Sequence, residues 1–259
     1  MYSPIELLYI AQNLAILTYF LGVLLYALPI PIYGIKKWAP KLVSDGIYAS
    51  VWVNIYAGIL YMISLISNII GISWDSYFLW LRQVLGFELN LYLIIRATAA
   101  TASVDPALSV LVAPFTLFMS FMTGLITLLQ TIIIISEIVY QYTPIFISLG
   151  ILLLSIPFRI GRGIGASLIA SFTIFYIGLP YLPEFLNNLN MNILSLPPPS
   201  TDQPQDLINL LATQIVPQII AATIVMPLIY ITILAGLSIG LAYAISGTGG
   251  RLPFPIDIL

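Results

Sequence analysis

The charged residues of this chain are so widely spaced that they divide it into long apolar stretches. Six uncharged stretches separate one group of charges from the next, at 7–35, 46–74, 106–136, 138–158, 163–183 and 207–250. Each is longer than the roughly 18 residues that indicate a helix crossing a lipid bilayer. The pattern therefore predicts an all-α, polytopic helical membrane protein.

A seventh apolar segment, 76–100, carries Arg82, Glu88 and Arg96, so its hydropathy alone leaves open whether it spans. Lys and Arg concentrate in cytoplasmic loops of membrane proteins. If 76–100 spans, the loop with Lys36, Lys37 and Lys41 and the turn with Arg159 and Arg162 both fall on the cytoplasmic side. We therefore predict about seven transmembrane helices, with the N-terminus outside and the C-terminus cytoplasmic.

These spans are expected to form a single integral membrane domain over 1–259. Their predicted bounds are 5–33, 47–72, 77–100, 107–139, 144–158, 163–182 and 218–246. The stretch 183–205, rich in Asn and Pro, is predicted to be an external loop, either an ordinary solvated connection or a docking site for a partner.

Proline positions refine the expected helix ends. Asp105 and Thr143 each precede a proline, an arrangement typical of an N-cap followed by the first helical residue, so helices are expected to begin at Pro106 and Pro144. Pro217 interrupts the last apolar stretch. We expect a surface helix over 206–216 before it and the final span after it.

The composition indicates that lipid surrounds this chain, and it excludes several kinds of catalytic and metal site. Of 259 residues, 60% are hydrophobic and 7% charged, against roughly 25% charged in soluble domains. Cys and His are absent, which excludes disulfides, thiolate or imidazole metal sites and His-dependent triads. No nucleotide-binding Gly-rich loop ending in Lys occurs. We predict no enzyme activity, no metal and no cofactor, with bound lipids as the one candidate ligand.

The charges within 77–100 are the first candidate functional residues, because a charge at the bilayer centre costs at least ~2.5 kcal/mol. Two interpretations stay open. Arg82 and Arg96 reach the headgroups while Glu88 is neutral in a helix interface, or the three form a polar element along a translocation path.

The second candidate is the turn between the fifth and sixth spans, which contains Pro157 and three glycines, Gly161, Gly163 and Gly165. Its two guanidiniums, Arg159 and Arg162, are candidates for contacting the phosphates of DNA or of lipids. The alternative is that they only mark the cytoplasmic side.

Small residues on the last predicted span form the third candidate feature. Gly236, Gly240 and Ala244 recur every four residues, which allows another helix to approach closely. We expect this helix packing to occur within the chain, with self-association as the alternative.

The stretch 142–180 resembles a known family. Its outer Pro144, the span ending at Pro157 and Arg159, the glycine turn and the next span closing near Pro180 are similar to the polytopic membrane subunits of type IV secretion and conjugation systems. Within these TrbL-like channels, the chain most resembles the membrane subunit of the crenarchaeal DNA-exchange importers, the CedA family. Its 44 isoleucines, with no Cys or His, suggest a heat-adapted host, and the resemblance implies an archaeal one.

The resemblance implies a non-catalytic channel subunit of a DNA-import or conjugation-type machine in the plasma membrane. It implies oligomerisation, small hydrophobic membrane subunits as partners, and a separate cytoplasmic ATPase of the conjugation or HerA type. Two rival functions stay open: a proton-coupled secondary transporter that uses Glu88, and a structural accessory subunit of a larger membrane complex.

Overall fold

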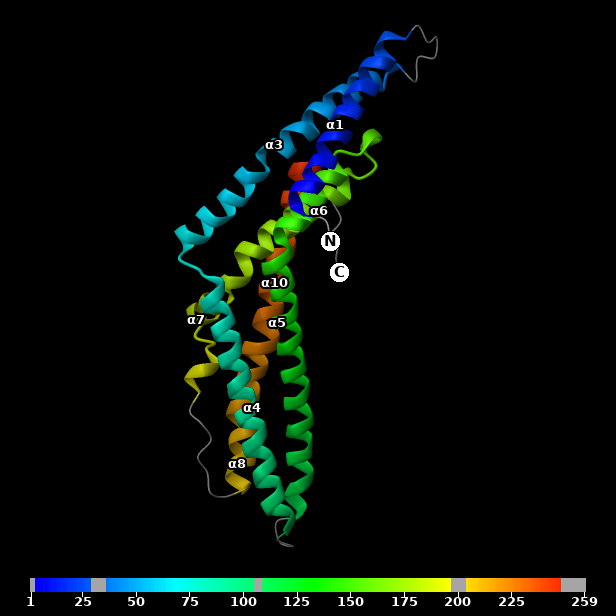
Figure 1. The fold of residues 1–259 in the computed structure, drawn as a ribbon. Coiled ribbons are helices and arrows are strands. Elements are labelled where there is room, and N and C mark those ends of the chain that lie inside the picture. The colour runs from blue at the N-terminus through cyan, green and yellow to red at the C-terminus, as the bar shows by residue number, and fades with distance from the viewer. Residues whose placement is uncertain (1–2, 29–35, 105–108, 197–203, 248–259) are drawn as a thin grey trace. The chain divides into compact units, whose positions relative to one another are not determined.

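The structure, a computed structural model, describes residues 3–28, 36–104, 109–196 and 204–247 (Figure 1). Regular structure in this part of the chain is helical. The α-helices are α1 (Pro4–Ala27), α3 (Ala39–Ile70), α4 (Trp74–Val104), α5 (Val112–Leu154), α6 (Arg162–Gly178), α7 (Leu182–Asn188), α8 (Pro204–Leu210), α9 (Val216–Ile219) and α10 (Met226–Ser246). Short 3₁₀ turns are η1 (Ser109–Leu111), η2 (Pro157–Arg159), η3 (Leu179–Tyr181) and η4 (Ile193–Ser195), whereas η5 (Leu211–Ile215) and η6 (Ile220–Val225) are π-helical.

The predicted class, an all-α membrane protein, is confirmed. Six helical segments in the described ranges are long and apolar enough to cross a bilayer: Pro4–Ala27, Ala39–Ile70, Trp74–Val104, Ser109–Leu154, Arg162–Asn188 and Pro204–Ser246. The third of them contains Arg82, Glu88 and Arg96, in agreement with the predicted span at 77–100. The orientation of the chain stays a prediction, as does the single domain.

The helix start predicted at Pro144 is wrong, because α5 continues through this residue to Leu154. A proline inside a helix removes one N–H and costs about 3 kcal/mol. Breaking the helix in lipid would instead leave several backbone groups unpaired, at several kcal/mol each. The spans predicted at 107–139 and 144–158 are therefore one helix of 43 residues, roughly 65 Å long at 1.5 Å per residue. No turn separates two spans near Glu137 in the described chain.

The chain groups into two compact units, and α5 and α10 contribute to both. The first unit comprises Met1–Gly71, Ile138–Gly178 and Thr232–Leu259, and the second comprises Ile72–Glu137 and Leu179–Ile231.

In the first unit, α1 and α3 form a hairpin of two helices lying side by side (Figure 1). α1 begins at Pro4 because Ser3 and Glu6 form a capping box, in which each side chain accepts a hydrogen bond from the other's backbone N–H. Glycines then set the spacing of the helices. A Cβ on Gly22 or on Gly46 would lie 2.7 Å from a backbone nitrogen of the opposite helix, so only glycine permits this approach.

The second hairpin of the first unit joins the end of α5 to α6 and uses the same device. A Cβ on Gly165 would lie 2.5 Å from the carbonyl oxygen of Gly150, and a Cβ on Gly150 would lie 2.7 Å from that of Gly165. The rings of Phe146 and Phe172 stack beside this contact with centroids 4.0 Å apart. The two backbones therefore touch where the sequence places glycines on both helices.

The second unit packs α4 against the first part of α5, η5 and neighbouring segments. Its buried core comprises Leu91, Ile95, Ala99, Ala102, Phe115, Met122, Leu125, Leu207, Leu211, Ile215 and Ile219. One polar contact lies in the same unit, since the hydroxyls of Tyr77 and Ser136 are hydrogen-bonded at 3.0 Å. Of the predicted external loop 183–205, residues 197–203 lie outside the described ranges.

Pro217 does not interrupt the last helical segment, contrary to the sequence-based expectation. Helix continues from Pro204 to Ser246, and the chain widens into π-helix just before each proline, in η5 before Pro217 and in η6 before Pro227. The π turn moves the preceding carbonyls away from the proline ring, which would clash with them in a regular α-helix. A separate surface helix at 206–216 and a final span beginning at 218 are therefore wrong.

The small residues predicted to pack against another helix of the same chain do not do so among the described residues, and self-association through them stays a prediction. Gly236, Gly240 and Ala244 are exposed, and a Cβ on either glycine would meet no atom within 4 Å in the described chain. The spacing of small residues along a helix predicts a face that another helix could approach closely. Whether another helix lies on that face depends on the tertiary packing.

Gly165→Ala is expected to lower the stability of the protein, whereas Gly240→Ala is expected to leave it nearly unchanged. The new methyl collides with the Gly150 carbonyl in the first case, which should cost about 1–3 kcal/mol, and enters open space in the second. Thermal unfolding of both variants in the same detergent measures the difference. Equal midpoints would contradict the close packing of α5 and α6.

Candidate functional site

The turn between α5 and α6 has an unusual backbone. Pro157 opens η2, and the next two residues, Phe158 and Arg159, take φ values of 64° and 62°. Side-chain-bearing residues rarely adopt this left-handed conformation, which costs roughly 1–2 kcal/mol each. Gly161 then lies against α5, where a Cβ would be 2.3 Å from the carbonyl oxygen of Leu153. The surrounding contacts therefore hold the turn in a strained form.

Asp45 of α3 holds both arginines of this turn. Arg159 donates from Nε to Asp45 Oδ2 at 2.7 Å and from Nη2 to Oδ1 at 2.8 Å, while Arg162 donates from Nη1 to Oδ1 at 3.4 Å. The Asp45 side chain is 15% exposed and that of Arg159 is 41% exposed. A bidentate pair of this exposure contributes about 1 kcal/mol and fixes the direction of the guanidinium.

The two arginines differ in the contacts that they make besides Asp45. The hydrogen bonds that Arg159 donates to Asp45 raise the pKa of Arg159 further above its ordinary value, so this residue is charged at every physiological pH. Arg162 lies over the ring of Tyr48, with 4.8 Å from its guanidinium carbon to the ring centroid. Gly163 and Gly165 follow at the start of α6, where the carbonyl oxygen of Gly163 accepts a hydrogen bond from Ser167 Oγ at 2.9 Å.

Further basic residues lie on the same end of the first unit. Lys41 is 5.1 Å from the ring centroid of Trp38, which contacts Phe158 of the turn edge to face. Of the eight Lys and Arg in the chain, five belong to what we call the basic end: Lys36, Lys37, Lys41, Arg159 and Arg162. Asp45 is the acid that the structure places among them. Guanidiniums and ammoniums with exposed aromatic rings suit phosphate groups at a membrane surface.

The basic end joins two segments that the sequence placed on the same side of the membrane. The loop near Lys37 and the turn at Arg159 were both predicted to be cytoplasmic, and the ion pairs through Asp45 bring them together. Asp45 itself was not predicted as a site residue. The sequence does show that Asp45 is the first acid after three lysines. Its partner Arg159, however, is 114 residues away in the chain, so the pair could not be predicted.

The three charges of α4 do not form one cluster. Arg82 and Arg96 are exposed, whereas Glu88 is fully buried in the second unit. Neither oxygen of Glu88 has a hydrogen-bond partner in the described chain, although Thr223 lies beside it.

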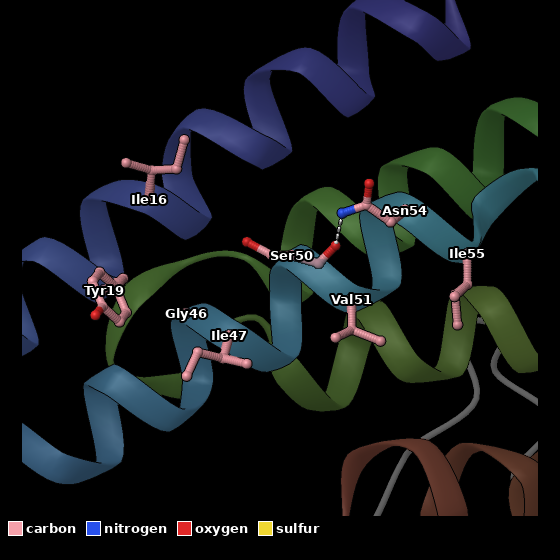
Figure 2. A pocket seen from close by; sticks show the side chains of 8 residues that line it. All are labelled: Ile16, Tyr19, Gly46, Ile47, Ser50, Val51, Asn54 and Ile55. Atoms are coloured by element: carbon pink, nitrogen blue, oxygen red, sulfur yellow. Dashed lines mark hydrogen bonds between the residues drawn. The ribbon is translucent and has the colours of Figure 1, made fainter.

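A polar group on the α1–α3 hairpin was also missed. Gln12 Nε2 donates to Ser50 Oγ at 3.4 Å, and Asn54 Nδ2 donates to the carbonyl oxygen of Ser50 at 2.7 Å. Ser50 and Asn54 line an open hollow of about 430 Å³ between α1 and α3, which Figure 2 shows together with Tyr19 and Ile55. Amides inside an apolar span are visible in the sequence, but their partners are not.

Comparison with known proteins decides the family. The chain is 44% identical over 263 residues to the DNA import protein CedA of Sulfolobus acidocaldarius, and the match covers 100% of both chains. The chain belongs to the CedA family of DNA import proteins. A family model described as DNA import protein CedA1 also matches residues 1–69. No solved structure matches the chain.

Membership in the CedA family confirms the resemblance inferred from the stretch 142–180. The CedA1 family model matches a different part, namely α1 and nearly all of α3, which form one hairpin of the first unit. Within this family member, that hairpin supplies Lys36, Lys37, Lys41 and Asp45 to the basic end, and the turn after α5 supplies the arginines.

Asp45→Ala is expected to open the turn at Arg159. Removing the carboxylate takes away three hydrogen bonds and leaves a strained backbone without its anchor. Trypsin should then cleave after Arg159 several-fold faster than in the unsubstituted protein, as followed by mass spectrometry. Asp75→Ala, which removes an exposed acid at the start of α4, is the control. Equal cleavage rates in all three proteins would contradict a structural role for the ion pairs.

Proposed function

We propose that this chain takes part in DNA import as a membrane-embedded channel subunit. The observation that carries the proposal is the full-length similarity to a protein named for DNA import. The basic end supports it from the residues themselves, because it gathers five of eight cations on one end of a unit and cations are what a phosphate backbone contacts.

The proposed role is non-catalytic and needs partners. Imported DNA must cross the boundary membrane of the cell, so the chain belongs in the plasma membrane. Eight Lys and Arg against ten Asp and Glu are too few to neutralise a polyanion along a whole path. Several copies, together with small hydrophobic subunits of the conjugation or type IV secretion kind, would complete the conduit. A separate cytoplasmic ATPase of the HerA type would supply the energy.

Arg159 and Arg162 are assigned the contact with phosphate in this proposal. Arg159 uses Nε and Nη2 on Asp45, which leaves its other terminal nitrogen to donate outward. The source of the phosphate, DNA or an anionic lipid headgroup, separates two forms of the same role. In the first form the arginines guide the substrate, and in the second they seat the subunit at the cytoplasmic interface.

The double substitution Arg159→Ala with Arg162→Ala is expected to lower DNA import at least tenfold. Import of a marker fragment into cells whose own gene has been deleted and replaced by the variant measures the effect. Quantification of the protein in isolated membranes shows whether the variant is still inserted. Import at the unsubstituted level, with normal membrane content, would remove the arginines from the proposed role.

Asp45→Asn is the matched control for this experiment. It removes the negative charge but keeps an oxygen that accepts a hydrogen bond from Arg159, so the turn keeps an anchor and both cations, and a phosphate contact predicts import close to normal. If instead Asp45→Asn lowers import as much as the double substitution does, the arginines act through the fold of the turn and not through phosphate.

A further inference from the structure

Glu88 is a carboxyl group enclosed in the core of the second unit. Glu88 is 0% exposed, and neither of its carboxyl oxygens has a hydrogen-bond partner among the described residues. The remaining charged side chains that the structure describes in this unit are exposed: Asp75, Arg82, Arg96, Glu137, Glu184 and Asp206. These come from α4, α5, α7 and α8, and no ion pair joins any of them to Glu88 in the described ranges. No positive charge therefore balances a carboxylate here.

The polar side chain beside Glu88 is Thr223, which belongs to η6. Thr223 is 4% exposed, and its hydroxyl has no hydrogen-bond partner in the described chain either. Two buried polar groups from different helical segments thus lie next to each other without a bond of ordinary geometry. Leaving buried polar groups unpaired is unfavourable, so the state of the carboxyl, ionised or protonated, decides whether this place is satisfied.

The π-helical form of η6 adds a third oxygen in the same turn. The α-helical donor for the carbonyl of Ala222 would be the N–H of Met226, but this group donates to Ala221. Its π-helical donor would be residue 227, and Pro227 has no N–H. The carbonyl oxygen of Ala222, one residue from Thr223, therefore lacks both the α-helical and the π-helical donor. Acceptors therefore outnumber donors at this place, because the Thr223 hydroxyl carries one hydrogen and an ionised carboxylate carries none.

A proton meets this requirement. An ionised carboxylate in apolar surroundings without a counter-charge is very costly, whereas a neutral carboxyl is tolerated and gains an O–H donor. We propose that Glu88 and Thr223 form a proton-binding site between α4 and η6, in which the packing of the second unit favours the protonated carboxyl. This site is independent of the proposed role in DNA import, because it concerns the second unit alone.

Labelling with dicyclohexylcarbodiimide tests the site directly. This apolar reagent adds the carboxylic O–H across one of its C=N bonds and then rearranges to a stable N-acylurea, so it reports a protonated carboxyl in an apolar place. In detergent-solubilised protein at mildly acidic pH, mass spectrometry should find the adduct on Glu88. The yield should fall roughly tenfold or more at alkaline pH, and Glu88→Gln should abolish it.

Exposed acids provide the matched control for the labelling. Glu184, which is exposed, should react with a water-soluble carbodiimide and not with the apolar one, and Glu184→Gln should leave the Glu88 adduct unchanged. Absence of any adduct on Glu88 would overturn the proposal. Suppression of the adduct by sodium chloride, with choline chloride ineffective, would also overturn it, because the site would then hold a sodium ion in place of the proton.

The stability of the protein gives a second readout. A carboxyl that must be neutral to remain buried contributes its stability at low pH and loses it as the pH rises. The thermal midpoint of the unsubstituted protein should therefore fall between mildly acidic and alkaline pH by several degrees more than that of Glu88→Gln. Thr223→Val, which removes the neighbouring hydroxyl, should lower the midpoint at acidic pH. Parallel pH profiles for the unsubstituted protein and Glu88→Gln would overturn the proposal.

Discussion

In lipid, a backbone N–H or C=O group has no partner except another group of the chain, and the fold follows from this constraint. It explains why three prolines lie inside helices without ending them. Pro144 stays within α5, and Pro217 and Pro227 each follow a widened π turn. In water each proline could have ended a helix, because solvent would have satisfied the freed groups.

Because the chain is helical, the arrangement of the helices in the first unit depends on where two backbones can approach each other closely. Gly22 and Gly46 bring α1 against α3, and Gly150 and Gly165 bring α5 against α6. These contacts replace the hydrophobic driving force, which is weak between helices already surrounded by lipid. They also bring the strained turn at Arg159 to the same end of the unit as Asp45.

The few charges of the chain are used in two opposite ways. At the basic end, cations gather around one acid, stay partly exposed and retain donors for an external phosphate. In the second unit, Glu88 is enclosed without any counter-charge. The first arrangement fits the proposed contact with phosphate at a membrane surface. The second requires a neutral carboxyl, which links the packing of that unit to a single proton.

Hydropathy, charge spacing and the motif at 142–180 are local properties, so they sufficed to identify the solvent, the helical class, the family and the turn with its two arginines. They did not determine that Pro144 and Pro217 lie within continuous helices, because a proline signals a possible end and the surrounding medium decides whether the helix ends there. The folded chain was needed to show that Asp45 binds Arg159, that Gly165 and not Gly240 packs closely, and that Glu88 lies beside Thr223. Each of these joins residues far apart in the chain, and periodicity along one helix says which side chains share a face but not what covers that face.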